Sequence, residues 1–296
     1  MGENRERDML SGKKALITGA DQGLGKEIAK EFLEQGASVC ICSRDEGRLR
    51  EAAKELECCR KEENGKVIFR RADVGITEDL DGLYEYLLSE FGTLDCVVNN
   101  AGIQGPIGDS AEVSWGKIEE VIRINLLGTL YSMRKAVSVF RAQKKQGRIV
   151  NLSGGGATGP RENFMGYALS KTGVVRATEI MAKETEKDGI YINAIAPGAM
   201  NTRMLDEVLK AGEEAMGAGA YAQALKQKES GGVSPKKAAH LAAYLASDRS
   251  GKISGRLISA LWDGWESFGT HEQEIMGSDI YTLRRIVPKD RGFAWE

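Results

Sequence analysis

A glycine-rich turn between an apolar run and an amphipathic stretch constrains the fold of this chain more than any other feature. Residues 13–18 (KKALIT) form a short apolar run typical of a strand, the glycines of 19–25 follow, and apolar residues then recur at helical spacing as far as Leu33. Glycines at such a turn let backbone N–H groups and the positive end of a helix approach a phosphate. The turn therefore indicates a nucleotide site, although its Gly-x-x-x-Gly-x-Gly spacing differs from the Gly-x-Gly-x-x-Gly fingerprint and leaves a plain turn open.

Strand-like and helix-like stretches alternate along the rest of the chain. Further strands are predicted at 38–43, 67–71, 94–98, 148–153 and 256–261, and helices at 46–60, 77–91, 115–141 and 235–247. The run at 38–43 (SVCICS) suits a parallel strand that is buried on both faces. This alternation predicts a doubly wound α/β fold, in which the ligand lies at the carboxyl ends of the strands.

The end of the second strand bears on the choice between NAD and NADP. In a doubly wound sheet it lies beside the adenosine ribose, where a carboxylate would bind the 2′-hydroxyl and an arginine would suit a 2′-phosphate. The residues here are Ser43 and Arg44, which favour NADP, whereas Asp21 and Gln22 in the glycine turn weigh against a phosphate. We therefore expect NADP in preference to NAD, with a solvated Arg44 at a helix start as the alternative.

Polar residues also follow the next two strands. Asp73 comes after the strand at 67–71 and is expected either to bind the adenine amino group or to serve as a turn or cap residue. The strand at 94–98 runs into Asn99, Asn100, Ala101 and Gly102. Small and amide residues at this edge of a central strand are where a doubly wound sheet binds its ligand.

Asn125 lies inside the predicted helix at 115–141, among apolar residues. A polar amide in that setting must find partners or it destabilises the fold. We expect either a local distortion of the helix that holds water or a hydrogen bond between helices.

Tyr167 and Lys171 are four residues apart at the start of another predicted helix, so their side chains share one face. A free tyrosine titrates near ~10, and a cation within a few Å stabilises its phenolate. Such a pair can do acid/base work at neutral pH. The same spacing also occurs on surface helices, so its meaning depends on the motifs around it.

Taken in order, these motifs resemble those of the short-chain dehydrogenase/reductase family in its single-domain form. They are Thr18-Gly-x-x-x-Gly-x-Gly25, Asp73, Asn99-Asn-Ala-Gly102, Asn125, Ser153, Tyr167-x-x-x-Lys171, and Pro197-Gly198 with Thr202. The match runs from residue 11 to Gly264. It implies a Rossmann-like α/β/α fold with a seven-stranded parallel sheet in the order 3-2-1-4-5-6-7.

The resemblance also implies an oxidoreductase that moves a hydride between NAD(P) and a secondary alcohol or carbonyl substrate. Tyr167 would be the general acid/base, Lys171 would lower the Tyr167 pKa and bind the nicotinamide ribose, and Asn125 would hold a water that links Lys171 to solvent. The cofactor would contact Gly19, Asp21, Gln22, Gly23, Leu24, Gly25, Ser43, Arg44, Asp73, Val74, Asn100, Ala101, Gly102, Tyr167, Lys171, Pro197, Gly198 and Thr202.

The catalytic serine of the family is displaced in this chain. In most members it lies 13 positions before the tyrosine, which here is Gly154, and Ser153 stands one position earlier. Successive glycines absorb an inserted residue easily, so we expect Ser153 to fill the serine role. The alternative is that the role is missing.

Composition excludes several classes of function. The 296 residues carry a formal net charge of -2, which gives no general attraction to nucleic acid or an anionic membrane. No apolar run approaches the roughly 18 residues of a membrane span, and the charged first residues lack the apolar middle of a signal peptide, so we expect a cytoplasmic protein. The five cysteines form no Cys-x-x-Cys pair and lie far from both histidines, so no metal site is expected.

The chain is expected to divide into a polar leader at 1–10, a dinucleotide-binding and catalytic domain at 11–264, and an extension at 265–296. Within the domain, residues 200–232 form either a substrate lid or a plain pair of surface helices. The extension is too apolar for a solvated tail, so we expect it to pack on the lid or on a partner subunit of a dimer or tetramer.

Arg161 and Asn163, just before Tyr167, favour a polar small-molecule substrate with hydroxyls, as in a sugar, or with a carboxylate. Two other functions stay open. A non-catalytic dinucleotide sensor is favoured by the displaced serine and disfavoured by the retained Tyr167, Lys171 and Asn125. An epimerase or lyase that uses bound NAD is disfavoured by the short region after the domain.

Overall fold

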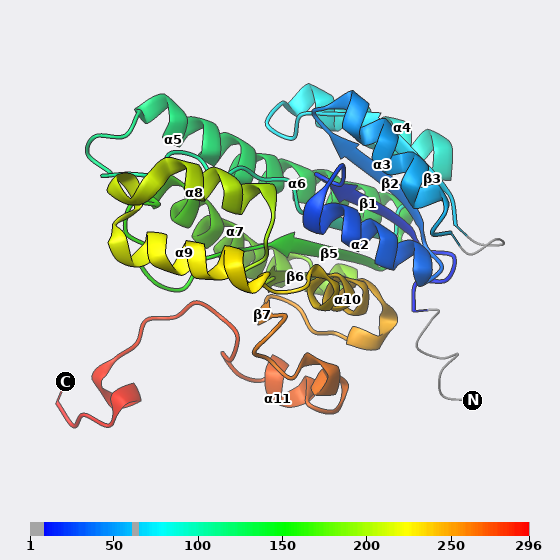
Figure 1. The fold of residues 1–296 in the computed structure, drawn as a ribbon. Coiled ribbons are helices and arrows are strands. Elements are labelled where there is room, and N and C mark those ends of the chain that lie inside the picture. The colour runs from blue at the N-terminus through cyan, green and yellow to red at the C-terminus, as the bar shows by residue number, and fades with distance from the viewer. Residues whose placement is uncertain (1–8, 61–64, 296) are drawn as a thin grey trace.

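A parallel sheet lies between two layers of helices in the computed structural model, which describes residues 9–60 and 65–295 (Figure 1). The sheet has seven strands in the order β3-β2-β1-β4-β5-β6-β7, which confirms the predicted fold. The strands are β1 (Lys14–Thr18), β2 (Ser38–Ser43), β3 (Val67–Arg71), β4 (Cys96–Asn99), β5 (Gly147–Leu152), β6 (Ile190–Ala196) and β7 (Leu257–Ser259).

Helices bury an apolar side against each face of the sheet. Those on one face are α2 (Gly23–Glu34), α3 (Glu46–Glu57) and α10 (Pro235–Ala246). Those on the other are α4 (Thr77–Phe91), α6 (Gly128–Gln143) and α7 (Met165–Glu184), with α5 (Trp115–Val121) leading into α6. Because each parallel strand needs a crossover to return, the carboxyl ends of all strands gather at one edge, and their loops build the site there.

The long helix predicted at 115–141 is interrupted. Residues Ile122–Leu127 form a π-helical turn between α5 and α6, and Asn125 lies in its middle with no exposed surface. Single π turns inside α-helices widen the backbone locally and often mark functional sites. The helix distortion expected at Asn125 is therefore present.

The predicted lid region forms two helices, α8 (Arg203–Met216) and α9 (Ala218–Ser230). Their apolar sides meet the fully buried Phe164, which precedes α7. Gly212 has φ of 82° and breaks the helical backbone inside α8, and Gly217, with φ of 80°, separates the two helices. The pair thus joins the domain through a small core of its own, next to the carboxyl ends of the strands.

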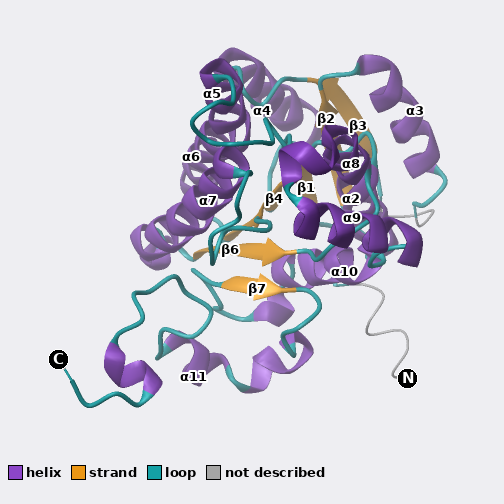
Figure 2. Ribbon diagram, turned by 60° about the vertical axis from the view of Figure 1, so that its left-hand side comes forward, coloured by secondary structure: helices purple, strands orange, loops and turns teal. Residues whose placement is uncertain are grey.

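The first part of the extension covers the edge of the sheet in its own chain (Figure 2). Trp265, Phe268 and Ile275 are buried in the core that α2 and α10 share, and Ile275 lies in the short helix α11 (Glu272–Met276). The N–H of Leu257 in β7 donates to the Tyr281 carbonyl oxygen at 2.8 Å. The extension as far as Tyr281 therefore belongs to the domain core.

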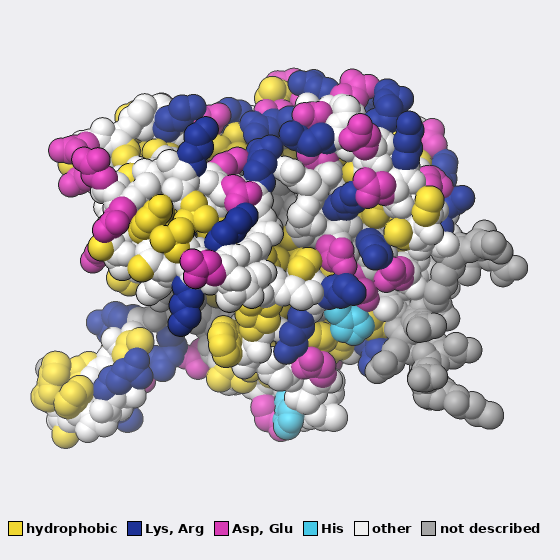
Figure 3. Space-filling model, viewed as in Figure 1, with side chains coloured by type: hydrophobic (Ala, Val, Ile, Leu, Met, Phe, Trp, Pro, Cys, Tyr) yellow, Lys and Arg dark blue, Asp and Glu magenta, His cyan; other side chains and the backbone are white. Residues whose placement is uncertain are grey.

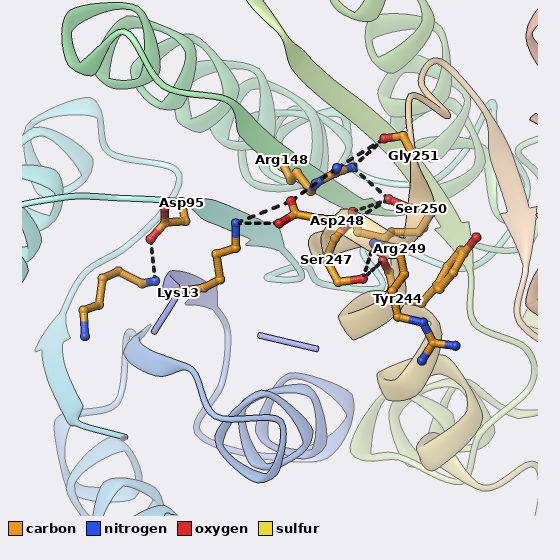
Figure 4. A network of polar contacts seen from close by, with 11 residues as sticks. Lys13, Asp95, Arg148, Tyr244, Ser247, Asp248, Arg249, Ser250 and Gly251 are labelled. Atoms are coloured by element: carbon orange, nitrogen blue, oxygen red, sulfur yellow. Dashed lines mark hydrogen bonds and ion pairs between the residues drawn. The ribbon is translucent and has the colours of Figure 1, made fainter. Parts of the chain in front are cut away.

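A polar network lies at the amino ends of the strands, on the side of the sheet away from the site (Figure 4). Arg148 at the start of β5 is buried and donates to Ser250 Oγ at 2.8 Å and to the Gly251 carbonyl oxygen at 3.2 Å. Asp248 pairs with Lys13 just before β1 at 3.3 Å. These bonds tie the amino ends of two strands to the turn after α10, which is a structural role.

Part of the predicted leader contacts the domain. Leu10 is fully buried and its N–H donates to the Gln35 carbonyl oxygen at 3.0 Å. The Met9 N–H donates to the Gln35 side chain at 3.3 Å. Residues 1–8 lie outside the described chain.

Candidate active site

The glycine turn between β1 and α2 is shaped by close packing as well as by access. Gly19 has φ of 65°, and a Cβ there would lie 2.8 Å from Ala101 Cα. A Cβ on Gly25 would overlap both the Gly19 carbonyl oxygen and the Asn100 amide. Gly23, with φ of 56°, has only Thr202 near such a Cβ, at 3.9 Å. Two glycines therefore serve packing, and the third leaves open space in front of the helix.

The first turn of α2 is suited to bind an anion. The helix begins at Gly23, and its N-cap residue Gln22 makes no side-chain hydrogen bond to the helix. The N–H groups of a first helical turn have no partner within the helix, and the helix dipole adds positive potential there. A diphosphate in the space in front of Gly23 would satisfy these donors.

The motif after β4 fixes this turn in place. Asn100 Nδ2 donates to the carbonyl oxygens of Thr18 and Gly19, both at 3.0 Å. Thr18 Oγ1 in turn accepts from the N–H groups of Asn100 and Ala101, both at 3.1 Å. The amide of Asn100 therefore holds the glycine turn, and the small residues Ala101 and Gly102 floor the cleft.

Two arginines and two acids stand at the adenosine end of the cleft. Asp21, whose side chain is 9% exposed, pairs with Arg48 Nε at 3.0 Å. Arg48 also pairs with Asp45 at 3.3 Å. In the described chain the Arg44 guanidinium has neither an ion pair nor a hydrogen bond. The carboxylate in the glycine turn is thus neutralised within the protein, and one cation stays available.

Asp73 serves as a turn residue and also lines the cleft. Its Oδ1 accepts from the Gly75 N–H at 2.8 Å, and its own N–H donates to Asp79 at 2.8 Å. Of the two roles expected for Asp73, the turn role is present. The contact with adenine stays a prediction.

The residues predicted to bind the cofactor come together. All of them except Gly198 line one elongated cleft of about 270 Å³ that runs from Arg44 to Tyr167. Gly198 lines an adjoining cavity of about 1040 Å³ between the loop after β5 and the pair α8 and α9. Figure 3 shows the surface hollowed beside α8 and apolar side chains gathered over α8 and α9. Tyr167, Ser153 and Pro197 line both spaces, so the chemistry would take place where they join.

Tyr167 and Lys171 are buried at this junction. Burial raises the pKa of the Tyr167 hydroxyl, and the positive charge of Arg161 opposes this rise. Burial lowers the pKa of the Lys171 ammonium to about 8. Lys171 Nζ donates to the Leu152 carbonyl oxygen at 2.8 Å and lies 5.7 Å from the centroid of the Tyr167 ring. The lowering of the Tyr167 pKa by Lys171 stays a prediction for the cofactor-bound protein.

Asn125 is held by hydrogen bonds from two directions. Its Nδ2 donates to the Ile103 carbonyl oxygen at 2.9 Å and to Ser170 Oγ at 3.1 Å, and its Oδ1 accepts from the Ile103 N–H at 2.8 Å. The side chain therefore joins the π-helical turn to the loop after β4 and to α7. The hydrogen bond between helices expected for Asn125 is present, while its water-holding role stays a prediction.

The loop after β5 presents Gly154, and not a side chain, to the tyrosine. A Cβ on Gly154 would overlap the Tyr167 hydroxyl. Ser153 lines the junction and is 3% exposed, and its Oγ is buried without a hydrogen-bond partner in the described chain. The Tyr167 hydroxyl therefore occupies the space that a side chain at position 154 would take. The assignment of the serine role to Ser153 stays a prediction.

Some residues of the two cavities were not predicted from the sequence. Arg48 lies in the first turn of α3, close in sequence to Arg44, and this nearness to the end of β2 could have indicated it. Gln104 follows the motif after β4 by two residues and lines the larger cavity, with no sequence signal of its own. Within residues 9–60 and 65–295, no three metal-binding side chains cluster and no helix is long and apolar enough to cross a membrane.

Known proteins with similar sequences and structures share this architecture. The family described as short chain dehydrogenase matches residues 13–212. The chain is 35% identical over 259 residues to 3beta-hydroxysteroid dehydrogenase 1 of Eggerthella lenta, over 85% of this chain and 93% of that protein. It is 31% identical over 257 residues to a diacetyl reductase, (S)-acetoin forming, of Staphylococcus epidermidis, over 85% of this chain and 97% of that protein.

A solved structure extends the likeness to a cofactor complex. A variant of actinorhodin polyketide ketoreductase with NADPH has a TM-score of 0.77 at 27% identity, over 87% of this chain and 97% of that one. The names of these three proteins give three different substrates. The likeness therefore leaves the substrate of this chain to be argued from its own cavity.

Proposed function

The chain belongs to the short-chain dehydrogenase/reductase family and is an NAD(P)-dependent oxidoreductase that acts on alcohol and carbonyl groups. From this premise we propose that it prefers NADP(H) and uses Tyr167 as its acid/base group. The observation that carries the proposal is the junction of the two cavities. Tyr167 and Lys171 from α7 lie there at the end of the cleft that begins at the glycine turn. A substrate carbonyl in the larger cavity would thus meet the tyrosine hydroxyl and the nicotinamide end of the cofactor together.

The residues present fit a nicotinamide dinucleotide. The first turn of α2 and the space in front of Gly23 would hold the diphosphate, and Gly102 and Lys171 would face the nicotinamide ribose. When bound, the cofactor supplies or takes the hydride.

The protein's part in the reaction is the movement of one proton. In the reductive direction the Tyr167 hydroxyl donates its proton to the carbonyl oxygen of the substrate, and in the oxidative direction its phenolate takes the proton of the alcohol. The Lys171 ammonium would stabilise the phenolate that forms, and Ser153 Oγ would donate to the substrate oxygen. An unpartnered buried hydroxyl at the junction supports this role for Ser153.

The preference for NADP(H) rests on the adenosine end. Asp21 would repel a 2′-phosphate, but its pairing with Arg48 cancels most of that repulsion. Arg44 then offers an uncommitted guanidinium at the end of β2, where the 2′-phosphate would lie. This arrangement suits a phosphate better than a ribose hydroxyl.

We also propose that α8 and α9 act as the lid and that the chain forms a dimer or tetramer. The glycine breaks at 212 and 217 support a moving lid.

Exposed apolar side chains support association of the chain into a dimer or tetramer. They lie on the outer face of α7 (Met165, Leu169 and Ile180) and in the tail (Ile286, Phe293 and Trp295). Light scattering on the full chain and on a chain ending at Leu283 tests whether the tail takes part.

The function is tested by NADPH oxidation with a panel of small ketones, keto acids and hydroxylated carbonyl compounds. We expect net NADPH consumption with at least one class, faster than with NADH. Tight binding of NADPH without consumption by any class would favour the sensor. Conversion of a substrate without net change in NADPH or NADH would favour an epimerase or lyase.

A further inference from the structure

Arg161 lies in the larger cavity on a rigid support. Its guanidinium carbon is 3.7 Å from the centroid of the Phe164 ring. Phe164 is fully buried, in contact with the lid residues Leu205 and Val208. A guanidinium stacked on a fixed aromatic ring keeps its N–H edge free to bind a ligand in one orientation. The position of Arg161 is therefore set by the fold.

The charge of Arg161 is not compensated by any described residue. Its guanidinium forms no ion pair or hydrogen bond there, although burial lowers its pKa. The two more deeply buried arginines are different, because Arg148 donates to Ser250 and Gly251, and Arg256 donates to Ile275 and Ser278. A half-buried cation without a partner is unfavourable unless a ligand supplies the negative charge.

Two neutral side chains in the same cavity are also unpaired. Gln104 Nε2 belongs to a side chain that is 4% exposed, and it has no hydrogen-bond partner among the described residues. Ser153 Oγ is unpaired in the same way. The amide nitrogen and the guanidinium can only donate, and the hydroxyl can donate. These three groups therefore lack an acceptor among the described residues, which a ligand with several oxygen atoms would provide.

The electrostatics of the cavity favour an anion. Of the described residues that line it, Glu162 alone carries a carboxylate, and that side chain is exposed and forms no ion pair with Arg161. The remaining lining is neutral apart from Arg161. A ligand carboxylate would thus meet one buried cation and no buried anion.

The glycines of the loop place Arg161 close to the reacting group. A Cβ on Gly154 would overlap the Tyr167 hydroxyl, and a Cβ on Gly155 would lie 3.4 Å from Arg161 Nη1. Adjacent Cα atoms are about 3.8 Å apart, so the hydroxyl and the guanidinium flank one short stretch of backbone. A ligand that reaches both groups therefore spans one short stretch of this loop.

We propose that the substrate is a short keto acid or hydroxy acid whose carboxylate lies within two carbons of the reacting carbon, and that Arg161 binds this carboxylate. This rests on the proposed function, because the reacting carbon is placed by Tyr167. Arg161 presents the planar pair of N–H groups that matches a carboxylate. Gln104 donates a further hydrogen bond to the same group or to the carbonyl oxygen.

Binding tests the proposal without turnover. Calorimetry with the Tyr167→Phe protein and NADPH would compare 3-oxobutanoate and 2-oxobutanoate with their methyl esters. We expect one acid to bind about 30-fold tighter than its ester, since charged hydrogen bonds are strong at a buried site. In the same Tyr167→Phe background, Arg161→Gln should remove the difference between acid and ester binding, and Arg161→Lys should keep part of it. Gln104→Met should weaken acid binding by about 5-fold.

Controls separate recognition from folding. Arg249→Gln removes an exposed arginine in the turn after α10, at the amino ends of the strands and away from the cavity. It should leave the ratio of acid to ester binding unchanged. The NADPH affinity of each Arg161 variant should match that of the parent, and its melting temperature should be no lower than that of the parent. Equal binding of acid and ester by the parent, or equal weakening of both by Arg161→Gln, would overturn the proposal.

The two proposals fail in different ways. If neutral ketones consume NADPH and the acids bind no better than their esters, the oxidoreductase proposal stands and the carboxylate proposal is wrong. If an acid binds through Arg161 and no compound consumes NADPH, the carboxylate proposal stands and the proposed NADPH-dependent turnover is wrong.

Discussion

The nucleotide half of the cleft and the substrate half differ in how their polar groups are paired. The nucleotide half comprises the glycine turn, the adenosine end and the motif after β4. There Thr18, Asn100, Asp73 and Asp21 all have partners within the protein, and the Arg44 guanidinium is the exception. The substrate half comprises the loop from Ser153 to Tyr167 and the residues facing α8 and α9. There Ser153, Gln104 and Arg161 have none in the described chain.

This difference separates a site built in advance from one completed by its ligand. Paired polar groups stabilise the fold and hold the cofactor cleft in shape before binding. Unpaired groups reduce stability and contribute only when a substrate meets them. Substitution of a paired group in the nucleotide half should therefore affect stability and cofactor binding together. Substitution of an unpaired group, in the substrate half or at Arg44, should affect binding or turnover without lowering stability.

The largest effect on stability is expected from Gly25→Ala in the nucleotide half. The new Cβ would overlap the Gly19 carbonyl oxygen and the Asn100 amide. We expect a loss of about 3 kcal/mol in the free energy of unfolding. We also expect about 100-fold weaker NADPH binding, since the displaced turn is the one proposed to hold the phosphate. Denaturant unfolding and fluorescence titration measure both quantities. Gly116→Ala on the exposed side of α5, where the Cβ has nothing within 4 Å, should be neutral or stabilising, and equal losses in the two variants would refute the packing argument.

A pair of hydroxyl deletions tests the comparison directly. Thr18→Val leaves two backbone N–H groups without their acceptor and should cost about 2 kcal/mol of stability. Ser153→Ala removes an unpaired hydroxyl, so stability should change by less than about 0.5 kcal/mol while kcat/KM falls about 30-fold. Chemical unfolding measures the change in stability of each variant, and steady-state kinetics measures its change in kcat/KM. A large stability loss in Ser153→Ala would place that hydroxyl in the fold and not in the reaction.

Lys171→Met should stabilise the protein while stopping turnover. The lowering of the Lys171 pKa from 10.5 to about 8 corresponds to a cost of roughly 3 kcal/mol for burying the ammonium ion in the folded protein. Loss of the hydrogen bond to Leu152 in the variant would cancel about 1 kcal/mol of the gain in stability. Because the folded-state pKa is the lower one, the unfolded chain binds more protons between pH 8 and pH 10.5, and the wild type gains stability across this window as pH rises. The advantage of the variant should shrink over the same window in urea unfolding at several pH values. A constant advantage would mean that Lys171 is not buried as an ammonium ion.

The smallest effect is expected from Arg44→Gln. Loss of a charged hydrogen bond to the 2′-phosphate should reduce kcat/KM for NADPH about 10-fold, with the value for NADH changed by less than about 3-fold. Initial rates with both cofactors measure the ratio. Arg50→Gln, on the helix α3 that follows Arg44 and paired with Glu46 outside the cleft, is the matched control and should change neither value. A fall with both cofactors would assign Arg44 to the fold.

The sequence was sufficient where local patterns decide the structure. The doubly wound fold follows from alternating strands and helices, and the gathering of motif residues in one cleft follows from glycine and amide motifs at strand ends. The strand order was implied by the resemblance to the family. The π-helical turn at Asn125 was anticipated as a distortion because a buried amide needs partners. These features depend on residues close together in the chain or on topology that they impose.

Contacts between distant segments could not be predicted in the same way. The pairing of Asp21 with Arg48 depends on how α3 lies beside the glycine turn. The packing of Trp265 and Phe268 against α10, and the approach of Gly154 to the Tyr167 hydroxyl, depend on packing geometry between segments. No periodicity records these distances, which is why Gln104 carried no signal in the sequence.

The central claim is that the Tyr167 hydroxyl moves the proton of the reaction. The direct test is the rate of NADPH oxidation at saturating substrate by the wild type and by Tyr167→Phe, with Tyr86→Phe on α4 as the control. We predict a rate about 1000-fold lower in Tyr167→Phe, with unchanged NADPH affinity and melting temperature, and no change in Tyr86→Phe. A rate in Tyr167→Phe within about 10-fold of the wild type would contradict the account, since general acid catalysis contributes more than that.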